Sequence, residues 1–352
     1  SGNLSGFFGS PRDGYFGGKH VLKLEDAWCE RFGVAHALSM NSATSGLFAA
    51  MGAIGISPGD EVIVPPYTMS ATAVAPLYFG GIPRFVDIED DTFCLDIDGV
   101  REAINPKTKA IVAVNLFGHP AQLSQLRALA DAHGIFLIED NAQAVLGEED
   151  GQLCGTLGHI GVYSLNIHKH IQCGEGGVCV TASKELATRM AGIRNHGENV
   201  TDWLGIEDLT NMVGMNLRMP EVSAAIASVQ LTKLDQLVDR VERIGTFLSE
   251  GVRELPGFKP PVVRSGCRHN YFMWSCRYNA EQVGLSRDEF LKLMKAEGVP
   301  LAGGYVAPIY RLPLFQKRIA LGTGGFPFSG SDLDYSKVVC PVVERMHEEE
   351  LI

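Results

Sequence analysis

Basic residues are in short supply in this chain. Lys and Arg number 30 against 41 Asp and Glu among 352 residues, which leaves a formal net charge of -11 at pH 7. No run of basic residues interrupts this acidic balance. Because phosphate backbones and anionic membrane surfaces are bound by clustered Lys and Arg, we expect neither a nucleic acid nor a membrane as a partner.

Long apolar runs and paired cysteines are absent as well. No stretch reaches the roughly 20 apolar residues of a membrane span, and the first eighteen residues contain no apolar core of signal-peptide length. The eight cysteines form no C-x-x-C pair: Cys29, Cys94, Cys154, Cys173, Cys179, Cys267, Cys276 and Cys340. We therefore expect no disulfide framework and no metal site, and we expect a soluble protein of the reducing cytoplasm.

The first two thirds of the chain alternate helix-like and strand-like segments, which predicts an α/β fold. Helical spacing of apolar residues marks 42–55 and QLSQLRALADAHG. Short apolar strands are expected in GDEVIVPP, GGIPRFVDI, KAIVAVNLFG, IFLIED, VYSLNI and GGVCVT. Strands of this kind, buried on both faces, are typical of a mainly parallel sheet flanked by helices.

The pattern changes in the last third. Residues 220–255 have a long helical apolar stripe, and a long helix of this kind commonly joins two lobes. We therefore predict a large domain over residues 1–240, with a glycine-rich arm at 1–18, and a smaller α+β domain over 241–352. In the smaller domain NYFMWSCRYN is strand-like and SRDEFLKLMKAEG is helix-like.

Three segments of the large domain place polar groups where a ligand can be bound. NSATSGL (41–47) stands at a helix start, where free N–H groups and the helix dipole favour an anion, although Ser and Thr also cap ordinary helices. Asp140 ends an apolar strand, the usual place for a ligand contact in an open α/β sheet, although Asp also caps helices. Ser164 lies in another strand, five residues before Lys169.

Lys169 stands between His168 and His170, ahead of the glycine-rich turn GEGG. A neutral lysine amine forms a Schiff base with an aldehyde, and burial lowers the lysine pKa towards that state. The alternative is a solvated surface charge. Together Thr44, Asp140, Ser164 and Lys169 meet the demands of pyridoxal phosphate (PLP): donors for its phosphate, a carboxylate for its ring nitrogen and a lysine for its aldehyde.

At this point the sequence resembles the sugar aminotransferases called the DegT/DnrJ group, which have the aspartate aminotransferase fold (fold type I of the PLP-dependent enzymes). The resemblance runs from about Phe16 to the last residues. It is carried, in order, by LEDAWCERFG, NSATSGL, PGDEVIVPPYT, LIEDNAQA, SLNIHKHIQCGEGG, RNHG and GMNLRMPEVSAAIASVQL. In such enzymes the Schiff-base lysine stands five residues before the first glycine of GEGG, which is Lys169 here.

The resemblance implies further cofactor contacts. Ala43 and Thr44 match the phosphate-binding residues, with Ala43 where the family more often has glycine. Met69 stands where the family usually stacks an aromatic ring on the cofactor. Gln143 matches a side-chain amide near the ring hydroxyl. Asn216 matches an asparagine that reaches the cofactor phosphate of the neighbouring subunit, so the resemblance implies a homodimer with shared active sites.

Substrate contacts are less defined by the sequence. His168 and His170 flank the reaction centre, and we expect them to contact substrate or to pack locally. Arg218 is a candidate for binding a carboxylate or a sugar phosphate, with an ordinary salt bridge as the alternative. Tyr305 and Tyr310 are candidates for stacking on or hydrogen-bonding to a sugar, with core packing as the alternative.

The reaction implied is transfer of an amino group, in two halves, from glutamate or glutamine to a keto-sugar. The aminated cofactor (PMP) carries the nitrogen between the halves, and Lys169 moves the proton. The acceptor is expected to be nucleotide-linked and to serve surface-polysaccharide (lipopolysaccharide) or antibiotic synthesis. Alternatives are a sugar dehydratase, which carries histidine in place of the lysine, and a non-catalytic regulator. The family's chains are expected to run a little beyond HEEELI.

Overall fold

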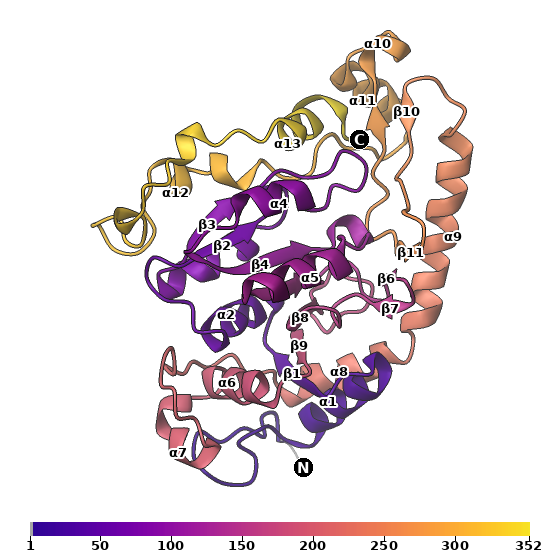
Figure 1. Cartoon of the computed structure of the whole chain (residues 1–352). Coiled ribbons are helices and arrows are strands. Elements are labelled where there is room, and N and C mark those ends of the chain that lie inside the picture. Colours follow the sequence, from indigo (N-terminus) through magenta and orange to yellow (C-terminus); the bar gives the residue numbers. More distant parts are fainter. Residues whose placement is uncertain (1–2) are drawn as a thin grey trace.

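The centre of the molecule is a seven-stranded sheet with the strand order β1-β9-β8-β5-β4-β2-β3 (Figure 1). This computed structural model describes residues 3–352. In spatial order the strands are β1 (His36–Met40), β9 (Gly177–Thr181), β8 (Ile160–Ser164), β5 (Phe136–Asp140), β4 (Thr108–Val114), β2 (Glu61–Val64) and β3 (Ile82–Phe85). Only β9 runs antiparallel to its neighbours in this sheet. The predicted α/β class with a mainly parallel, helix-flanked sheet is confirmed.

Helices cover the sheet and continue into the C-terminal third. They are α1 (Lys19–Phe32), α2 (Ala43–Ala53), α3 (Ala71–Val74), α4 (Ile97–Ala103), α5 (Leu123–His133), α6 (Lys184–Arg194), α7 (Thr201–Leu204), α8 (Glu221–Leu231), α9 (Leu234–Val252), α10 (Ala280–Val283), α11 (Arg287–Ala296), α12 (Pro313–Gln316) and α13 (Pro341–Arg345). Helix α2 packs on β8 and β9, α5 on β4 and β5, and α6 on β1 and β9. Alternate residues of β8 and β9 belong to two separate hydrophobic cores, so these strands are buried on both faces. Val162 and Cys179 pack in the core that contains residues of α2, and Tyr163 and Val178 in the core that contains residues of α1.

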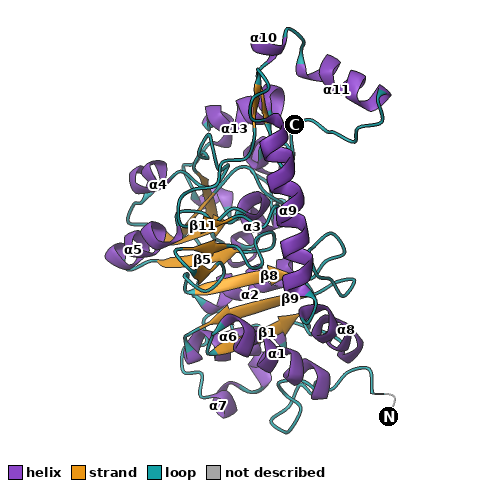
Figure 2. Cartoon of the chain, turned by 90° about the vertical axis from the view of Figure 1, so that its right-hand side faces the viewer, coloured by secondary structure: helices purple, strands orange, loops and turns teal. Residues whose placement is uncertain are grey.

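The predicted long helix over 220–255 is wrong, because the structure has two helices there. Helix α8 ends at Leu231 and α9 begins at Leu234. At the break the hydroxyl of Thr232 donates to the carbonyl of Val229 at 2.8 Å, and the N–H of Lys233 donates to the carbonyl of Gln230 at 2.9 Å. Figure 2 shows α9 running from α8 towards α10 and α11. Apolar spacing continues across this short turn, so periodicity alone does not reveal it.

The strand predicted in NYFMWSCRYN is also mostly wrong. Only Arg277–Tyr278 (β12) is a strand, and it pairs with β10 (Phe258–Lys259). The residues before it form a loop in which Tyr271 has a φ of 50°. The N–H groups of this loop bond to side chains and to another loop: for example, the N–H of Met273 donates to the carbonyl of Phe117 at 3.2 Å. Tertiary contacts therefore replace the strand ladder that β-branched and aromatic residues favour.

The C-terminal third contributes to two hydrophobic cores. Tyr278 and Ile352 belong to a small cluster with parts of α9, α10 and α11. By contrast, Ile309, Phe315 and Met346 pack into the same core as the sheet strands. The remaining short strands β6 (Glu148–Glu149), β7 (Gln152–Leu153) and β11 (Cys267–Arg268) form a three-stranded sheet that joins both parts of the chain (Figure 1). The predicted division near residue 240 stays a prediction.

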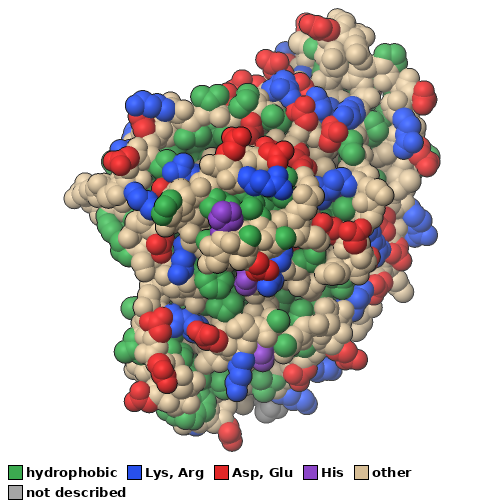
Figure 3. Space-filling model, in the orientation of Figure 1, with side chains coloured by type: hydrophobic (Ala, Val, Ile, Leu, Met, Phe, Trp, Pro, Cys, Tyr) green, Lys and Arg blue, Asp and Glu red, His purple; other side chains and the backbone are tan. Residues whose placement is uncertain are grey.

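Charged side chains of both signs are interspersed on the face shown in Figure 3. Several of them join the C-terminal third to the loop after β3. Asp90 pairs with Arg345, and Asp91 lies 3.6 Å from Arg277. Within residues 3–352 no helix combines the length and the apolar character needed to span a membrane. All eight cysteines are free thiols.

Candidate active site at the carboxyl edge of the sheet

Two of the predicted site residues end neighbouring parallel strands. Asp140 is the last residue of β5 and Ser164 the last residue of β8. In the ladder Asp140 stands opposite Val162, so both strands deliver their carboxyl ends to the same edge of the sheet. Lys169 follows in the loop after β8, where its N–H donates to the carbonyl of Asn166 at 2.9 Å. Parallel pairing therefore brings together residues that are separated by 29 positions in the sequence.

Asp140 is a buried carboxylate with two hydrogen-bond donors. Asp140 is 5% exposed. The Thr72 hydroxyl donates to Oδ2 at 2.7 Å and the Ala142 N–H donates to Oδ1 at 3.2 Å. Burial raises the pKa of Asp140, while Thr72, Ala142 and the charge of Lys169 act in the opposite direction. A cationic group facing this carboxylate would offset the burial and hold it ionised.

The pKa of Lys169 is shifted in the opposite direction from that of Asp140. Burial lowers the pKa of its amine, and the charge of Asp140 opposes this shift. Its Nζ lies 4.4 Å from the centre of the Phe272 ring, a residue of the C-terminal third. A lysine with a lowered pKa next to a buried carboxylate has the electrostatic features of a nucleophilic amine, and such perturbed pairs concentrate at functional sites.

The start of α2 provides an anion site next to Ser164. Ser42 caps the helix by accepting from the Ser45 N–H at 3.0 Å, which leaves the first turn's N–H groups at Ala43 and Thr44 directed out of the helix. Gly177 of β9 pairs with Ser164, and a methyl group on Gly177 would lie only 2.6 Å from the Ala43 nitrogen. Glycine at 177 therefore lets the helix start approach the strand that carries Ser164.

Gln143 is fixed at both ends of its amide. Its Oε1 accepts from the Phe117 N–H at 2.7 Å, and its Nε2 donates to the Tyr305 hydroxyl at 2.9 Å. The Tyr305 ring packs edge-on against Tyr67 and Phe117, at centroid distances of 5.7 and 5.1 Å. Tyr67 is fully buried, and its hydroxyl has no hydrogen-bond partner within the described part of the chain, residues 3–352. Tyr305 therefore lies beside a predicted cofactor residue.

Tyr310 has different surroundings. It is 2% exposed, its hydroxyl donates to Glu344, and its ring lies 5.9 Å from that of Phe85 in the sheet core. These contacts are those of a core tyrosine, and its role towards substrate stays a prediction. Met69 is 55% exposed in the loop after β2.

The two histidines beside Lys169 differ in exposure. His168 is exposed, and its N–H donates to Asn166 Oδ1 at 3.2 Å. His170 is half-buried, and its Nε2 donates to the carbonyl of Asn270 at 3.2 Å. Burial lowers the pKa of His170, and the nearby charge of Lys169 lowers it further. His168 is thus open to a ligand, whereas His170 is engaged within the chain.

Asn216 and Arg218 flank Leu217, whose carbonyl accepts from the N–H of Asn41 at 2.8 Å, two residues before α2 begins. Asn216 is exposed and its Oδ1 accepts from Arg218 Nε at 2.8 Å. Arg218 also reaches Asn195 Oδ1 at 3.4 Å. Neither residue has a hydrogen bond to the Asp140 and Lys169 group among residues 3–352. Their predicted roles, Asn216 towards a neighbouring subunit and Arg218 towards substrate, stay predictions.

Four further residues of the site follow from no sequence pattern: Thr72, Tyr67, Asn270 and Phe272. Thr72 follows Met69 by three positions, but no spacing rule links it to Asp140. Phe272 and Asn270 lie in the segment that was predicted to be a strand. Only the folded chain brings these groups to the carboxyl edge of the sheet.

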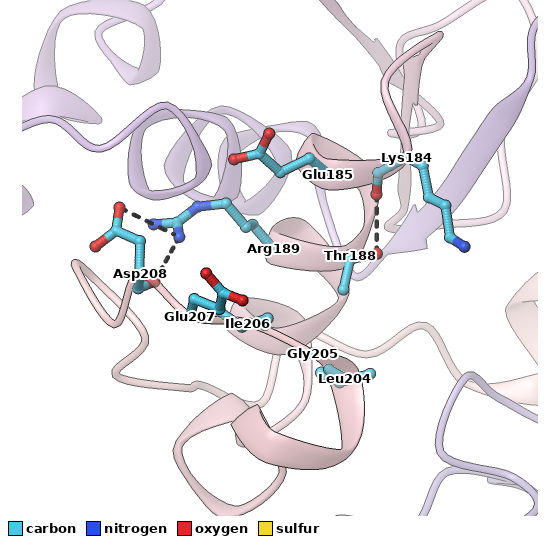
Figure 4. A pocket seen from close by; sticks show the side chains of 9 residues that line it. All are labelled: Lys184, Glu185, Thr188, Arg189, Leu204, Gly205, Ile206, Glu207 and Asp208. Carbon is cyan, nitrogen blue, oxygen red and sulfur yellow. Dashed lines mark hydrogen bonds and ion pairs between the residues drawn. The ribbon is translucent and has the colours of Figure 1, made fainter.

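A separate hollow of about 530 Å³ lies between α6 and residues 204–208 (Figure 4). Its central side chain is Arg189, whose guanidinium donates to the carbonyls of Ala53, Asp208 and Thr210 at 2.8, 2.7 and 2.5 Å. These contacts hold the loop against α6 and occupy the arginine. The hollow contains none of the predicted site residues.

Comparison with known proteins agrees with this geometry. The fold is that of the fold type I PLP-dependent enzymes. Residues 12–352 match the model of the DegT/DnrJ/EryC1/StrS aminotransferase family, and the chain belongs to that family. The resemblance inferred from the sequence motifs is thereby confirmed.

The named relatives are aminotransferases. A UDP-N-acetyl-3-dehydro-alpha-D-glucosamine 3-aminotransferase of Acidithiobacillus ferrooxidans is 34% identical over 91% of this chain and 79% of that protein. An L-glutamine:2-deoxy-scyllo-inosose aminotransferase of Streptomyces kanamyceticus is 34% identical over 93% of this chain and 79% of that protein.

Solved structures agree in fold. DesV of S. venezuelae, in complex with a ketimine intermediate, has a TM-score of 0.81 at 29% identity and covers 95% of this chain and 83% of its own. A GDP-4-keto-6-deoxymannose-3-dehydratase with bound GDP-perosamine has a TM-score of 0.71 at 26% identity, over 80% of this chain and 78% of its own.

Proposed function

We propose that this aminotransferase uses PLP to move an amino group from glutamate or glutamine to a keto-sugar, most often a nucleotide-linked one, in amino-sugar biosynthesis. The observation that carries the proposal is the pairing of Lys169 and Asp140 at the carboxyl edge of the sheet, with opposite pKa shifts caused by burial. The relatives that act on a UDP-linked keto-sugar and on a keto-cyclitol support the acceptor class.

The residues at the edge of the sheet fit PLP. Among residues 3–352, Lys169 is the only cation whose charge acts on the buried Asp140 carboxylate, and a protonated ring nitrogen would supply a second one. The glycine at 177 brings the free N–H groups of Ala43 and Thr44 to the strand end that carries Ser164, which suits a phosphate. Gln143 is held rigidly enough to meet a ring substituent.

When bound, PLP supplies an electron sink for the pair left on the substrate carbon after a proton departs. Asp140 would offer its carboxylate to the ring nitrogen, and Thr72 and Ala142 hold its two oxygens in place. Lys169 would hold the cofactor through Nζ, and the same atom would take and return the proton when the amine is free. Ala43, Thr44 and Ser164 would hold the phosphate, and exposed Met69 would contact the ring.

We further propose that the working unit is a cytoplasmic homodimer in which Asn216 serves the partner's cofactor phosphate. The exposure of Asn216 supports this arrangement, because within residues 3–352 its side chain has no hydrogen bond to Asp140 or Lys169 of its own chain. His168, His170, Arg218 and Tyr305 are proposed as substrate contacts. The presence of Lys169 disfavours a dehydratase of the type that carries histidine there.

The test is spectroscopic. Protein loaded with PLP is expected to be yellow, and glutamate or glutamine is expected to shift its absorbance as nitrogen passes to the cofactor. Lys169→Ala is expected to lose the lysine-linked band and about a thousandfold or more in turnover. Lys184→Ala, an exposed lysine of α6, is the matched control and should behave like the wild type.

Two outcomes contradict the proposal. Yellow wild-type protein that neither amino acid alters would rule out the transaminase reaction. Full activity in Lys169→Ala would rule out this lysine as the base. Transfer of isotopically labelled nitrogen from glutamate into screened keto-sugars then identifies the acceptor.

A further inference from the structure

A turn of the C-terminal third contacts the lysine site in a way that the family motifs do not describe. Residues 270–272 follow β11 and reach the Lys169 loop, the loop after β5 and the turn at Phe117–Gly118. In the sequence Asn270 is 100 positions from His170 and 127 positions from Gln143, so only the fold brings them together. Its contacts fall into two parts, a buried amide and an aromatic ring.

The buried amide is Asn270, which is fully buried. Its Nδ2 donates to the carbonyls of Gln143 at 3.0 Å and Val145 at 2.8 Å, and its Oδ1 accepts from the Phe272 N–H at 3.0 Å. Both amide hydrogens and the amide oxygen are therefore used. Only a side chain with two donors and one acceptor satisfies this set, and each partner left unpaired in a buried place would carry a desolvation cost.

The backbone of Asn270 adds two more connections. Its N–H donates to the carbonyl of Gly118 at 3.1 Å, and its carbonyl accepts from His170 Nε2 at 3.2 Å. The approach to Gly118 is so close that a methyl group there would lie 1.8 Å from Asn270 Oδ1, and Gly118 has a φ of 101°. The turn is thus seated in one position relative to Gln143 and His170, which flank the proposed cofactor site.

The aromatic ring is that of Phe272. Lys169 Nζ lies 4.4 Å from its centre, within the range of a cation–π contact, and the His170 ring lies 6.0 Å from it. Phe272 is half-buried, so its ring face meets the ammonium group where water is partly excluded. The ring therefore stabilises the charged form of the lysine and holds its end in place.

We propose that residues 270–272 form part of the lysine site. Phe272 holds the Nζ end of Lys169 in the cofactor-free protein, and Asn270 is the positioning residue that fixes the place of the Phe272 ring. The inference rests on the proposed function, because it takes Lys169 as the lysine that captures PLP. It adds that the C-terminal third sets the protonation and direction of this amine.

The test measures PLP capture by cofactor-free protein as a function of pH. Only the neutral amine attacks an aldehyde: a C=N bond replaces the C=O bond, and the oxygen leaves as water with the two amine protons. Among residues 3–352, Asp140 and His170 are the titratable groups whose charges interact with that of Lys169. A substitution at Phe272 leaves both residues in place, and of the two only His170 has a ring contact with Phe272, at 6.0 Å. A shift in the capture profile therefore reports on the ring.

Phe272→Leu removes the aromatic face, so the ammonium form loses stabilisation and the pKa of Lys169 falls. The capture profile is expected to move to lower pH by about half to one and a half units. Phe272→Tyr keeps the face and is expected to retain the wild-type profile. Phe258→Leu, a ring that packs on Tyr278 and Phe290, is the matched control.

Asn270→Ala is expected to weaken PLP binding about tenfold or more and to move the capture profile in the same direction as Phe272→Leu. Asn279→Ala, an exposed helix cap, is its control. Asn270 also stabilises the fold. If Asn270→Ala does not yield folded protein, the comparison of Phe272→Leu with Phe272→Tyr tests the proposal.

The proposal is overturned if the profile of Phe272→Leu superimposes on that of the wild type or moves to higher pH. It is also overturned if folded Asn270→Ala has the wild-type profile and affinity. Failure of the wild type to capture PLP at any pH would instead contradict the proposed function, so the two failures are distinguishable.

Discussion

The hydroxyl of Thr72 donates to Asp140 Oδ2 at 2.7 Å across 68 positions of sequence. This bond is one of two that hold the buried carboxylate, and it lowers the pKa of Asp140 against the effect of burial. Loss of the bond is expected to raise that pKa further and to loosen the carboxylate beneath the proposed ring nitrogen.

Thr72→Val keeps the shape and removes the hydroxyl. A hydrogen bond to a charged group contributes about 1.5–3 kcal/mol, so PLP affinity is expected to fall about tenfold or more. Equilibrium titration of cofactor-free protein with PLP measures the change. Thr188→Val is the control, since that hydroxyl only donates to Lys184 on α6. Unchanged affinity in Thr72→Val would show that the bond does not support the site.

Asp140→Asn is expected to lower turnover and to raise the stability of the cofactor-free protein. Burial raises the folded pKa of Asp140, so the group stabilises the fold fully below its unfolded pKa, and this contribution is lost as pH rises through the folded pKa. An amide does not ionise. Near neutral pH, cofactor-free Asp140→Asn should therefore melt at a higher temperature than the wild type. Its free energy of unfolding should be larger by about 1.4 kcal/mol per unit of pKa shift.

The gap in melting temperature should close as the pH falls to about 4, because both side chains are then neutral. Thermal unfolding across this range provides the measurement. Turnover should fall about a hundredfold or more in the same variant. Asp235→Asn, which breaks an exposed salt bridge to Arg31, should show no such closing gap. A wild type more stable than Asp140→Asn at neutral pH contradicts the sign.

Met69→Phe is expected to tighten cofactor binding. Met69 is 55% exposed and stands where the resemblance places a stacking ring. Aromatic stacking contributes about 0.5–1.5 kcal/mol, so release of PLP should slow about two- to tenfold. The rate of PLP release is measured by mixing the loaded protein with an excess of an agent that traps free PLP. Met294→Phe on α11 controls for the substitution itself, and faster release in Met69→Phe would argue against a ring-covering role.

Shared active sites predict complementation between subunits. Asn216→Ala and Lys169→Ala should each be impaired, but a reassociated equal mixture should regain about a quarter of the wild-type sites, because half of the dimers are mixed and each has one intact site. The assay is turnover after mixing. A mixture of Lys169→Ala and Asp140→Asn should regain nothing, since both groups serve the same chain's site. No recovery with Asn216→Ala would contradict the shared site.

Residues at strand ends could be anticipated because parallel strands deliver their carboxyl ends to one edge. Asp140 and Ser164 follow recognisable apolar strands, and their meeting needs no knowledge of the rest of the fold. The same holds for the helix start at Thr44, whose small hydroxyl residues mark a cap. Local pattern and the geometry of a parallel sheet suffice for these positions.

The contacts of Phe272 and Asn270 could not be anticipated in this way. Their segment is rich in strand-forming residues, yet buried hydrogen bonds from Asn270 to Gln143 and Val145 outweigh that local preference. The break between α8 and α9 was hidden for a related reason, because a two-residue turn leaves the apolar spacing unchanged.

By itself, then, the sequence determined the α/β class and the family, and it predicted the lysine site, since these depend on short-range spacing and on residue type. The tertiary structure alone decided which side chains surround that lysine. Thr72 at Asp140 and Phe272 at Lys169 arrive from distant segments, and only the packing of the C-terminal third and the loop after β2 against the sheet sets such long-range contacts. Their energies depend on burial, which no local pattern encodes.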